Sequence, residues 1–306
     1  MELLRRGLKL SHLRIVAALA ESGQIGIAAA RLGITQPAAS RLLAEVETLT
    51  GHRVHSRAGR GITLTAEGQA LARRAARALA EISDAGREID ELANGALGHV
   101  MLGSVTGPAL DRVLPALRAA RLSLPQVTAE VEVATSDILG DQLLSGRLDF
   151  TLARLPTDRD PSLFDIQIIG SEPVSLVVRR GHRLAQHPDL QPGLLMDYDW
   201  VLPGPGAILR RTVLDRLQAL GLPEPQGRLA TSSFLLTLAM LQQSNAIAPL
   251  ATAVATRFAS GPEAPYAVLP IDLGITVAPY GVVTRSGATL TPAADRIRAL
   301  ILRDPD

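Results

Sequence analysis

Small and apolar residues near the start of the chain follow a helical spacing that is broken once by glycine. Ala28–Leu32 predicts the end of one helix, and Gly33 supplies the left-handed backbone conformation that ends a helix without steric strain. Thr35 can cap a second helix, in whose first turn Pro37 loses nothing by lacking an N–H. The apolar stripe that docks this helix on the first consists of Leu42, Leu43, Val46 and Leu49. The pattern predicts a helix-turn-helix whose second helix begins near Gln36.

The first turns of this second helix are small and polar, which suits a helix end lying in a DNA major groove. Its Gln, Ser and Arg side chains can reach base edges. The predicted DNA contacts are Thr35, Gln36, Pro37, Ser40 and Arg41. Gly51–Thr65 combines turn glycines with short β-compatible segments, so it predicts a winged hairpin whose Arg57 and Arg60 lie along phosphates or in the minor groove. In the alternative interpretation, Arg57 pairs with Glu45 or Glu47.

Apolar residues then recur every three or four positions from Thr65, a candidate N-cap, to about Leu92, and they predict one long helix. A helix of this length has little of its own chain to pack against, and its alanines would let a second subunit approach closely. We therefore expect a homodimer or homotetramer. The expected dimer contacts are Leu71, Ala75, Leu79, Ile82 and Ile89. The alternative is that the stripe belongs to the core of a single chain.

A glycine-flanked step at Asn94–Gly98 predicts a hinge, and the pattern changes beyond it. Short apolar runs alternate with helical segments, which implies an α/β fold with a parallel sheet covered by helices. The expected strands are Val100–Val105, Val127–Val133 and Leu148–Ala153, and the expected helices are Ala109–Leu122 and Ile138–Ser145. Val174–Val178 is expected to open a second domain, and Ile271–Val283 to return the chain to the first.

Hydroxyl and glycine residues follow several of these strands. Parallel sheets bind ligands at the carboxyl ends of their strands, where helix N-termini offer free N–H groups and partial positive charge. The candidate ligand contacts are Thr106, Gly107, Ser136, Arg154, Pro203, Gly204, Thr231 and Ser232. Ser and Thr at helix starts are also the ordinary capping residues, so each hydroxyl has a purely structural alternative.

Charge is distributed unevenly along the chain. Residues 1–62 hold nine basic and four acidic side chains, an excess of five, whereas the whole chain has a net charge of +1, so the remainder carries −4. A basic head on a mildly acidic body is expected where only the head meets phosphate.

Composition narrows the class of protein further. The 306 residues are 47% hydrophobic, enough for two or three compact units, and cysteine is absent, which excludes disulfides, thiolate metal sites and cysteine nucleophiles. His182 and His187 are too loosely spaced for a specific metal site, and the chain has neither a G-x-S-x-G elbow nor a G-x-x-x-x-G-K phosphate loop. No run of about 18 apolar residues is present. We expect a cytoplasmic protein that is not an enzyme and needs no cofactor or metal.

Four phrases together resemble the N-terminal domain of LysR-type transcriptional regulators. They are L-K-L-S-H-L-R (8–14), A-A-A-R-L-G-I-T-Q-P-A-A-S-R (28–41), R-A-G-R-G (57–61) and L-T-A-E-G (64–68). The first phrase and T-Q-P-A-A-S-R are most similar to the galactose-binding-protein-regulator-like subgroup. The chain departs from the family at Ile25, where an aromatic residue is usual, and at Val54 and His55, where a Leu-Phe pair is usual.

The resemblance implies a winged helix-turn-helix over 1–64, a dimerising linker helix over 65–93 and a two-lobed, periplasmic-binding-protein-like effector domain over 94–306. Lobe I would comprise about 98–160 and 268–306, and lobe II about 161–267. Ser136 and Arg154 would face the effector. The implied partners are promoter DNA and a small-molecule effector such as a sugar or sugar acid, with RNA polymerase as a further candidate. The rivals are a two-lobed solute-binding protein or an α/β enzyme with an incidental DNA-binding head, and a mobility-shift assay on promoter DNA separates them from a regulator.

Overall fold

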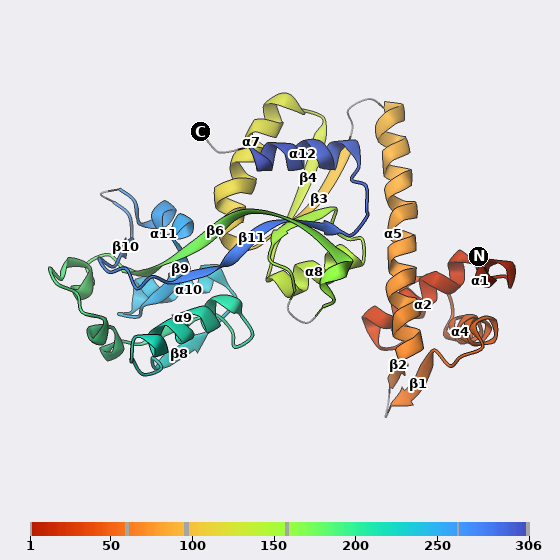
Figure 1. Cartoon of the computed structure of the whole chain (residues 1–306), viewed down its shortest axis with the longest axis horizontal. Helices are drawn as coiled ribbons and strands as arrows, with labels where there is room; N and C mark the ends of the chain where they lie inside the picture. The colour runs from red at the N-terminus through yellow and green to blue at the C-terminus, as the bar shows by residue number, and fades with distance from the viewer. Residues whose placement is uncertain (1, 59–60, 95–97, 157–158, 262, 304–306) are drawn as a thin grey trace.

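The computed structural model describes residues 2–58, 61–94, 98–156, 159–261 and 263–303. A small helical head, one long helix and an α/β part of two lobes follow one another along the chain (Figure 1). The elements of the head are α1 (Glu2–Arg5), α2 (Leu10–Ser22), α3 (Ile25–Arg31), α4 (Gln36–Thr50), β1 (His55–Ala58) and β2 (Gly61–Leu64).

The predicted helix-turn-helix is confirmed, and its second helix begins at Gln36. Gly33 has a φ of 66°, the left-handed conformation expected after α3. Thr35 caps α4, since its hydroxyl accepts a hydrogen bond from the Ala38 N–H at 3.4 Å. On the opposite side of α4, three side chains are fully buried against α2 and α3, namely Ala39, Leu43 and Val46. The capping and the burial together fix which face of α4 points away from the head.

The wing is an antiparallel hairpin of β1 and β2. Its base packs closely on the start of the long helix, because a Cβ at Gly68 would overlap the Val54 carbonyl. Val54 and His55 lie where the resemblance implies a Leu-Phe pair. Val54 is buried, and His55 Nδ1 lies 3.1 Å from Glu47 Oε1. A polar contact thus lies where the resemblance leads us to expect an aromatic side chain.

The long helix α5 (Ala66–Asn94) is confirmed, and Thr65 caps it by accepting a hydrogen bond from the Gly68 N–H at 3.1 Å. Its first half packs on α2, and its second half lies along lobe I (Figure 1). The contacts with lobe I are largely polar. They join Arg77 to Ser286 O (2.5 Å), Asp84 to Arg285 (2.5 Å), Arg87 to Asp149 (2.5 Å) and Glu91 to the Ala293 N–H (3.0 Å).

The rest of the chain alternates strands and helices around a mixed sheet. The strands of this part are β3 (Gly98–Ser104), β4 (Val127–Val133), β5 (Phe150–Ala153), β6 (Phe164–Arg179), β7 (Trp200–Leu202), β8 (Gly227–Ala230), β9 (Ala248–Ala251), β10 (Tyr266–Val268) and β11 (Thr276–Arg285). Of these, β7 and β8 form a separate two-stranded parallel sheet. The α-helices of this part are α6 (Thr106–Pro108), α7 (Leu114–Ser123), α8 (Ser136–Leu144), α9 (Ile208–Ala219), α10 (Phe234–Gln243), α11 (Thr252–Ala259) and α12 (Pro292–Leu302). A π-helical turn, Ala109–Val113, joins α6 to α7, and short 3-10 helices lie at Pro161–Leu163, Arg183–Gln186 and Pro192–Asp197.

The expected parallel sheet is correct for β3, β4 and β5, but β6 and β11 run antiparallel to their neighbours. The strand order is β10-β6-β11-β5-β3-β4, with β9 also paired to β6. We define lobe I as β3, β4, β5, the start of β6 and most of β11 with α7, α8 and α12. Lobe II comprises the end of β6, the strands β7 to β10 and the helices α9 to α11.

Two long strands cross from one lobe to the other (Figure 1). The start of β6 pairs with β11 in lobe I, and its end pairs with β9 and β10 in lobe II. The sequence pattern places this strand only at Val174–Val178 and starts lobe II near 161, whereas the structure places Phe164 in the core of lobe I. The difference arises because Gly170–Pro173 lies between the two cores and interrupts the apolar pattern.

Separate cores stabilise the parts. Lobe I has apolar clusters on both faces of its sheet, and lobe II is built around the fully buried Trp200, whose indole donates to the Leu195 carbonyl at 3.1 Å. Within the described ranges, no helix has both the length and the apolar character needed to cross a bilayer.

Candidate DNA-binding face and effector site

The N-terminal half of α4 presents one continuous polar face to solvent. All five predicted contacts on it are exposed, namely Thr35, Gln36, Pro37, Ser40 and Arg41, whereas Ala39 on the opposite side is fully buried. Gln36 also lies beside α3, since its Oε1 is 3.8 Å from where a Cβ of Gly26 would stand. An exposed helix start with amide, hydroxyl and guanidinium groups matches the donors and acceptors of base edges in a major groove.

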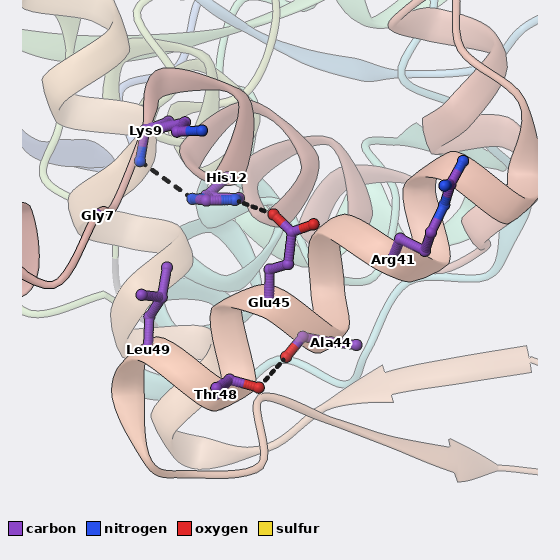
Figure 2. A pocket seen from close by; sticks show the side chains of 8 residues that line it. All are labelled: Gly7, Lys9, His12, Arg41, Ala44, Glu45, Thr48 and Leu49. Carbon is purple, nitrogen blue, oxygen red and sulfur yellow. Dashed lines mark hydrogen bonds and ion pairs between the residues drawn. The ribbon is translucent and has the colours of Figure 1, made fainter.

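A shallow hollow of about 410 Å³ lies between the start of α2 and the middle of α4 (Figure 2). Lys9 and Arg41 are on its rim, and both are basic. His12 is buried beneath it, accepting the Lys9 N–H at Nδ1 (3.0 Å) and placing Nε2 2.9 Å from Glu45 Oε2. Because Nδ1 accepts, the Nε2 proton points to Glu45. This contact fixes α4 relative to α2 and leaves Arg41 on the exposed side.

The two predicted wing contacts are Arg57 and Arg60. Arg57 lies in β1 opposite Ile62, and Arg60 lies outside the described residues. Both carboxylates that could pair with Arg57 have other contacts, because Glu45 binds His12 and Glu47 accepts the Val54 N–H at 2.9 Å.

In lobe I the structure brings together three of the predicted ligand contacts. Arg154 ends β5 and is 6% exposed, and its backbone N–H donates to the Ser136 hydroxyl at 3.2 Å. Its Nε donates to the Ala278 carbonyl at 2.6 Å. Gly107 lies buried in the same place, whereas Thr106 is exposed beside it.

Glu172, which is not among the ligand contacts predicted from the sequence, completes this group. Its Oε2 accepts from Arg154 Nη2 at 2.5 Å, and its Oε1 occupies the space that a Cβ of Gly107 would need. Glu172 lies where β6 passes between the lobes, and Gly107 also lies close to Ala251 of lobe II. The signal that could have identified it is an acidic residue next to Pro173, just before the mostly apolar run of Val174–Val178.

Tyr280 lies on β11, opposite Gly170 of β6, which is close to Glu172 in the chain. Its ring packs against Gly170, where a Cβ would stand 3.1 Å from the phenol oxygen. Burial raises the pKa of Tyr280, and the nearby Arg112 opposes this shift. The phenol therefore stays protonated at neutral pH and can donate a hydrogen bond.

In lobe II the other predicted contacts form a second group. Pro203 and Gly204 follow β7, Thr231 and Ser232 follow the parallel β8, and the Thr231 N–H donates to the Leu202 carbonyl at 3.0 Å. The Thr231 hydroxyl accepts from the Ser233 N–H at 3.0 Å, and Ser233 rather than Thr231 caps α10. Ser232 is exposed. Among the described side chains, no three His, Cys, Asp or Glu residues gather as a metal site would require.

The expected dimer contacts fall into two classes. Leu71 packs on the core of the head, and Ala75 is buried within the chain. These two residues therefore belong to the core of a single chain, which was the alternative to a dimer contact. Leu79 is half-buried. Ile82 and Ile89 are 52% and 65% exposed on the side of α5 that faces solvent.

Comparisons with known proteins agree over the whole chain. Residues 10–69 match the family described as bacterial regulatory helix-turn-helix protein, lysR family, and residues 93–305 match the LysR substrate binding domain. The HTH-type transcriptional regulator GbpR of Rhizobium radiobacter is 43% identical over 257 residues, which cover 83% of this chain and 85% of that protein. GbpR of Azospirillum brasilense is 34% identical over 292 residues, covering 95% and 85%.

Solved structures share the fold. Full-length OxyR from Pseudomonas aeruginosa has a TM-score of 0.66 at 22% identity, covering 96% of this chain and 94% of that one. Full-length CbnR in complex with its target DNA has a TM-score of 0.62 at 24% identity, covering 97% and 100%. The relatives are transcriptional regulators rather than enzymes. The chain belongs to the LysR family of DNA-binding transcriptional regulators, and it joins the family's helix-turn-helix to its effector-binding domain.

Proposed function

We propose that this regulator reads its operator through the start of α4 and holds the DNA backbone with its wing. Gln36, Ser40 and Arg41 contact base edges, Thr35 and Pro37 lie against the adjacent backbone, and Arg57 and Arg60 bind phosphates or the minor groove. The supporting observation is that the five α4 residues share the one exposed face of a helix that is buried on its other side. The protein acts in the cytoplasm, with RNA polymerase as a further partner at the promoter.

Operator binding tests the base-reading role of Gln36. Gln36→Ala should cost on the order of 1–3 kcal/mol on operator DNA and leave binding to random DNA nearly unchanged. Gln218, on α9 of lobe II, is also exposed, so Gln218→Ala is the matched control. Equal losses of Gln36→Ala on operator and random DNA would exclude base reading by this side chain.

The effector that we propose is a sugar or sugar acid bound between the lobes. The lobe I group of Gly107, Ser136 and Arg154 and the lobe II group of Pro203–Gly204 and Thr231–Ser232 supply the polar contacts, with Thr106 at the edge. Arg154 supports a polyhydroxylated ligand, because a buried guanidinium can donate several hydrogen bonds in fixed directions. The two similar proteins named GbpR are consistent with the subgroup that two phrases of the sequence resemble.

The pair of Arg154 with Glu172 favours a neutral sugar over a sugar acid. The guanidinium charge is already balanced at 2.5 Å, so an anionic ligand would have to displace a carboxylate that is 14% exposed. A neutral sugar can instead accept from Arg154 and donate to Glu172 while the pair remains intact.

Calorimetry against a panel of sugars and sugar acids tests this proposal. Arg154→Ala should abolish binding, and Arg183→Ala, at an exposed position of lobe II, should not. Glu172→Gln separates the ligand classes, because it should weaken a neutral sugar and strengthen an anion. Equal ligand affinity in wild-type and Arg154→Ala protein would remove Arg154 from the site.

We also propose that α5 forms the dimer contact along its exposed seam. Ile82 and Ile89 are joined there by Ala85 and Gly86, both exposed, and a Cβ on Gly86 would meet no atom within 4 Å. This spacing of three and four residues repeats along one side of a helix, and its small residues permit close approach. We propose that the chain is divided into a head over 1–64, a linker helix over 65–93 and an effector domain over 94–306. Two strands of the effector domain, β6 and β11, run through both of its lobes.

A further inference from the structure

One short helix reaches from the effector group to the DNA-binding head. The first residue of α8, Ser136, accepts the Arg154 N–H, and the helix spans nine residues, about 13 Å at about 1.5 Å per residue. Its far end turns at Gly146 and Arg147, beside both α5 and α2. The two ends of α8 therefore touch the two functional parts of the molecule.

The far end of α8 is closely fitted to α5. Gly146 has a φ of 75°, and a Cβ there would overlap the Cβ of Ala80. Arg285 bonds to both elements, donating from Nη1 to the Leu143 carbonyl at 3.4 Å and from Nη2 to Asp84 at 2.5 Å. A displacement of α8 along its axis therefore cannot be absorbed at this end without moving α5 or releasing these contacts.

The head itself is reached by Arg147. Its Nη2 lies 3.0 Å from Glu21 Oε2, at the end of α2, and the same oxygen accepts from Arg31 Nη1 at 2.8 Å. Arg31 ends α3, the helix that precedes α4 in the helix-turn-helix. Arg147 and Glu21 are 56% and 34% exposed, so water screens the pair and keeps it weak. A contact of this strength can form and break within the thermal range, as a switch requires.

We propose that α8 couples the effector group of Gly107, Ser136 and Arg154 to the DNA-binding head, and that the Arg147–Glu21 pair is the latch that sets the orientation of the head relative to lobe I. A ligand that repositions Ser136 and Arg154 moves α8 as a unit, and Arg147 gains or loses Glu21. The role as an effector relay rests on the function proposed above, whereas the latch itself requires no effector.

The test uses the full-length protein without effector, so that its failure is distinct from a failure of the proposed effector site. The chain has no cysteine, so cysteines introduced at the exposed positions Ala20 of α2 and Ala119 of α7 carry the only two spin labels. Mixing with excess unlabelled protein leaves one labelled chain in each oligomer, and double electron–electron resonance then gives the distance from head to lobe I.

We expect a narrow distance peak in the parent and in Arg147→Lys, which keeps the charge. Arg147→Glu and Glu21→Gln should shift or broaden the peak, whereas Arg121→Glu, an exposed charge reversal on α7, should not. Gly140→Ala tests the relay, because its Cβ would overlap Pro156 and push α8 from its place without touching the latch. Its peak should shift as well, with circular dichroism confirming that it is folded. An unchanged peak in Arg147→Glu overturns the latch, and an unchanged peak in folded Gly140→Ala overturns the relay.

Discussion

Arg87 offers the sharpest test of how α5 is held on lobe I. Its Nη2 lies 2.5 Å from Asp149 Oδ1 and 2.6 Å from Asp84 Oδ1. Burial alone would lower the pKa of Arg87, but its hydrogen bonds to Asp149 and Asp84 outweigh this and raise it. Asp149 is only 4% exposed and also accepts the Met101 N–H of β3 at 2.8 Å. Arg87→Met keeps most of the side-chain volume and removes the charge, which leaves Asp149 without its cation.

The cost follows from the exposure of the two side chains. Removing one member of a buried ion pair costs about 3–5 kcal/mol, because the remaining charge is left uncompensated. Arg87 is 26% exposed, so water can enter part of the vacated space, and we expect a smaller loss of about 2 kcal/mol. The loss should appear where Asp149 binds the backbone, in β3 and the second half of α5.

Hydrogen exchange followed by mass spectrometry measures this local stability. A loss of about 2 kcal/mol corresponds to about 30-fold faster exchange of peptides covering Gly98–Ser104. Arg74→Met, at an exposed position of the same helix, is the control. Adding Asp149→Asn to Arg87→Met should recover part of the loss, because the unpaired charge is gone. If Arg87→Met exchanged at the same rate as Arg74→Met, the ion pair would not hold α5 on lobe I.

Three further predictions concern DNA, assembly and pH. Arg60→Ala should flatten the log–log dependence of DNA affinity on salt by about one unit, since about one counterion is no longer released; an unchanged slope and affinity would place Arg60 away from DNA. Ile82→Asp should give smaller species in sedimentation and Ser83→Asp, one residue outside the seam, should not; full assembly of both would exclude the α5 seam as the interface. Burial lowers the pKa of His182, so its contribution to stability is present above its ordinary value of 6.5 and is lost as pH falls through the lower folded value. The urea midpoint of Trp200 fluorescence should therefore fall between pH 7.5 and 5.5 in wild-type and His187→Gln protein but less in His182→Gln, and equal falls in all three would contradict this origin.

The sequence predicts best where one local signal decides the structure. Gly33, Thr35 and Thr65 each end or start a helix through their own backbone or hydroxyl, and the structure has those helix boundaries where the pattern places them. It predicts less where one element serves two cores. Between residues 170 and 173 the strand β6 passes from the core of lobe I to the core of lobe II. No single apolar period therefore describes the whole strand.

The candidate site shows the same limit. Residues that follow strands can be found from the order of elements along the chain, and Ser136, Gly107 and Arg154 do lie together. Glu172 could not be found in this way, because it reaches them from the interior of a strand that the pattern starts too late. Which faces of α5 are covered also depends on tertiary packing, since Ala75 and Ile82 belong to the same stripe but only Ala75 is buried.

The strand order has a consequence for how the protein is made. The strand β11, at Thr276–Arg285, lies between β5 and β6, so the sheet of lobe I stays open until almost the whole chain has left the ribosome. The head and α5 are complete about 180 residues earlier. Contacts between residues so distant in sequence form slowly. The seam at Ile82 and Ile89 that we propose as the dimer contact is thus exposed while the effector domain is still unfinished, so we expect two nascent chains on one messenger to pair through it before either can bind a ligand.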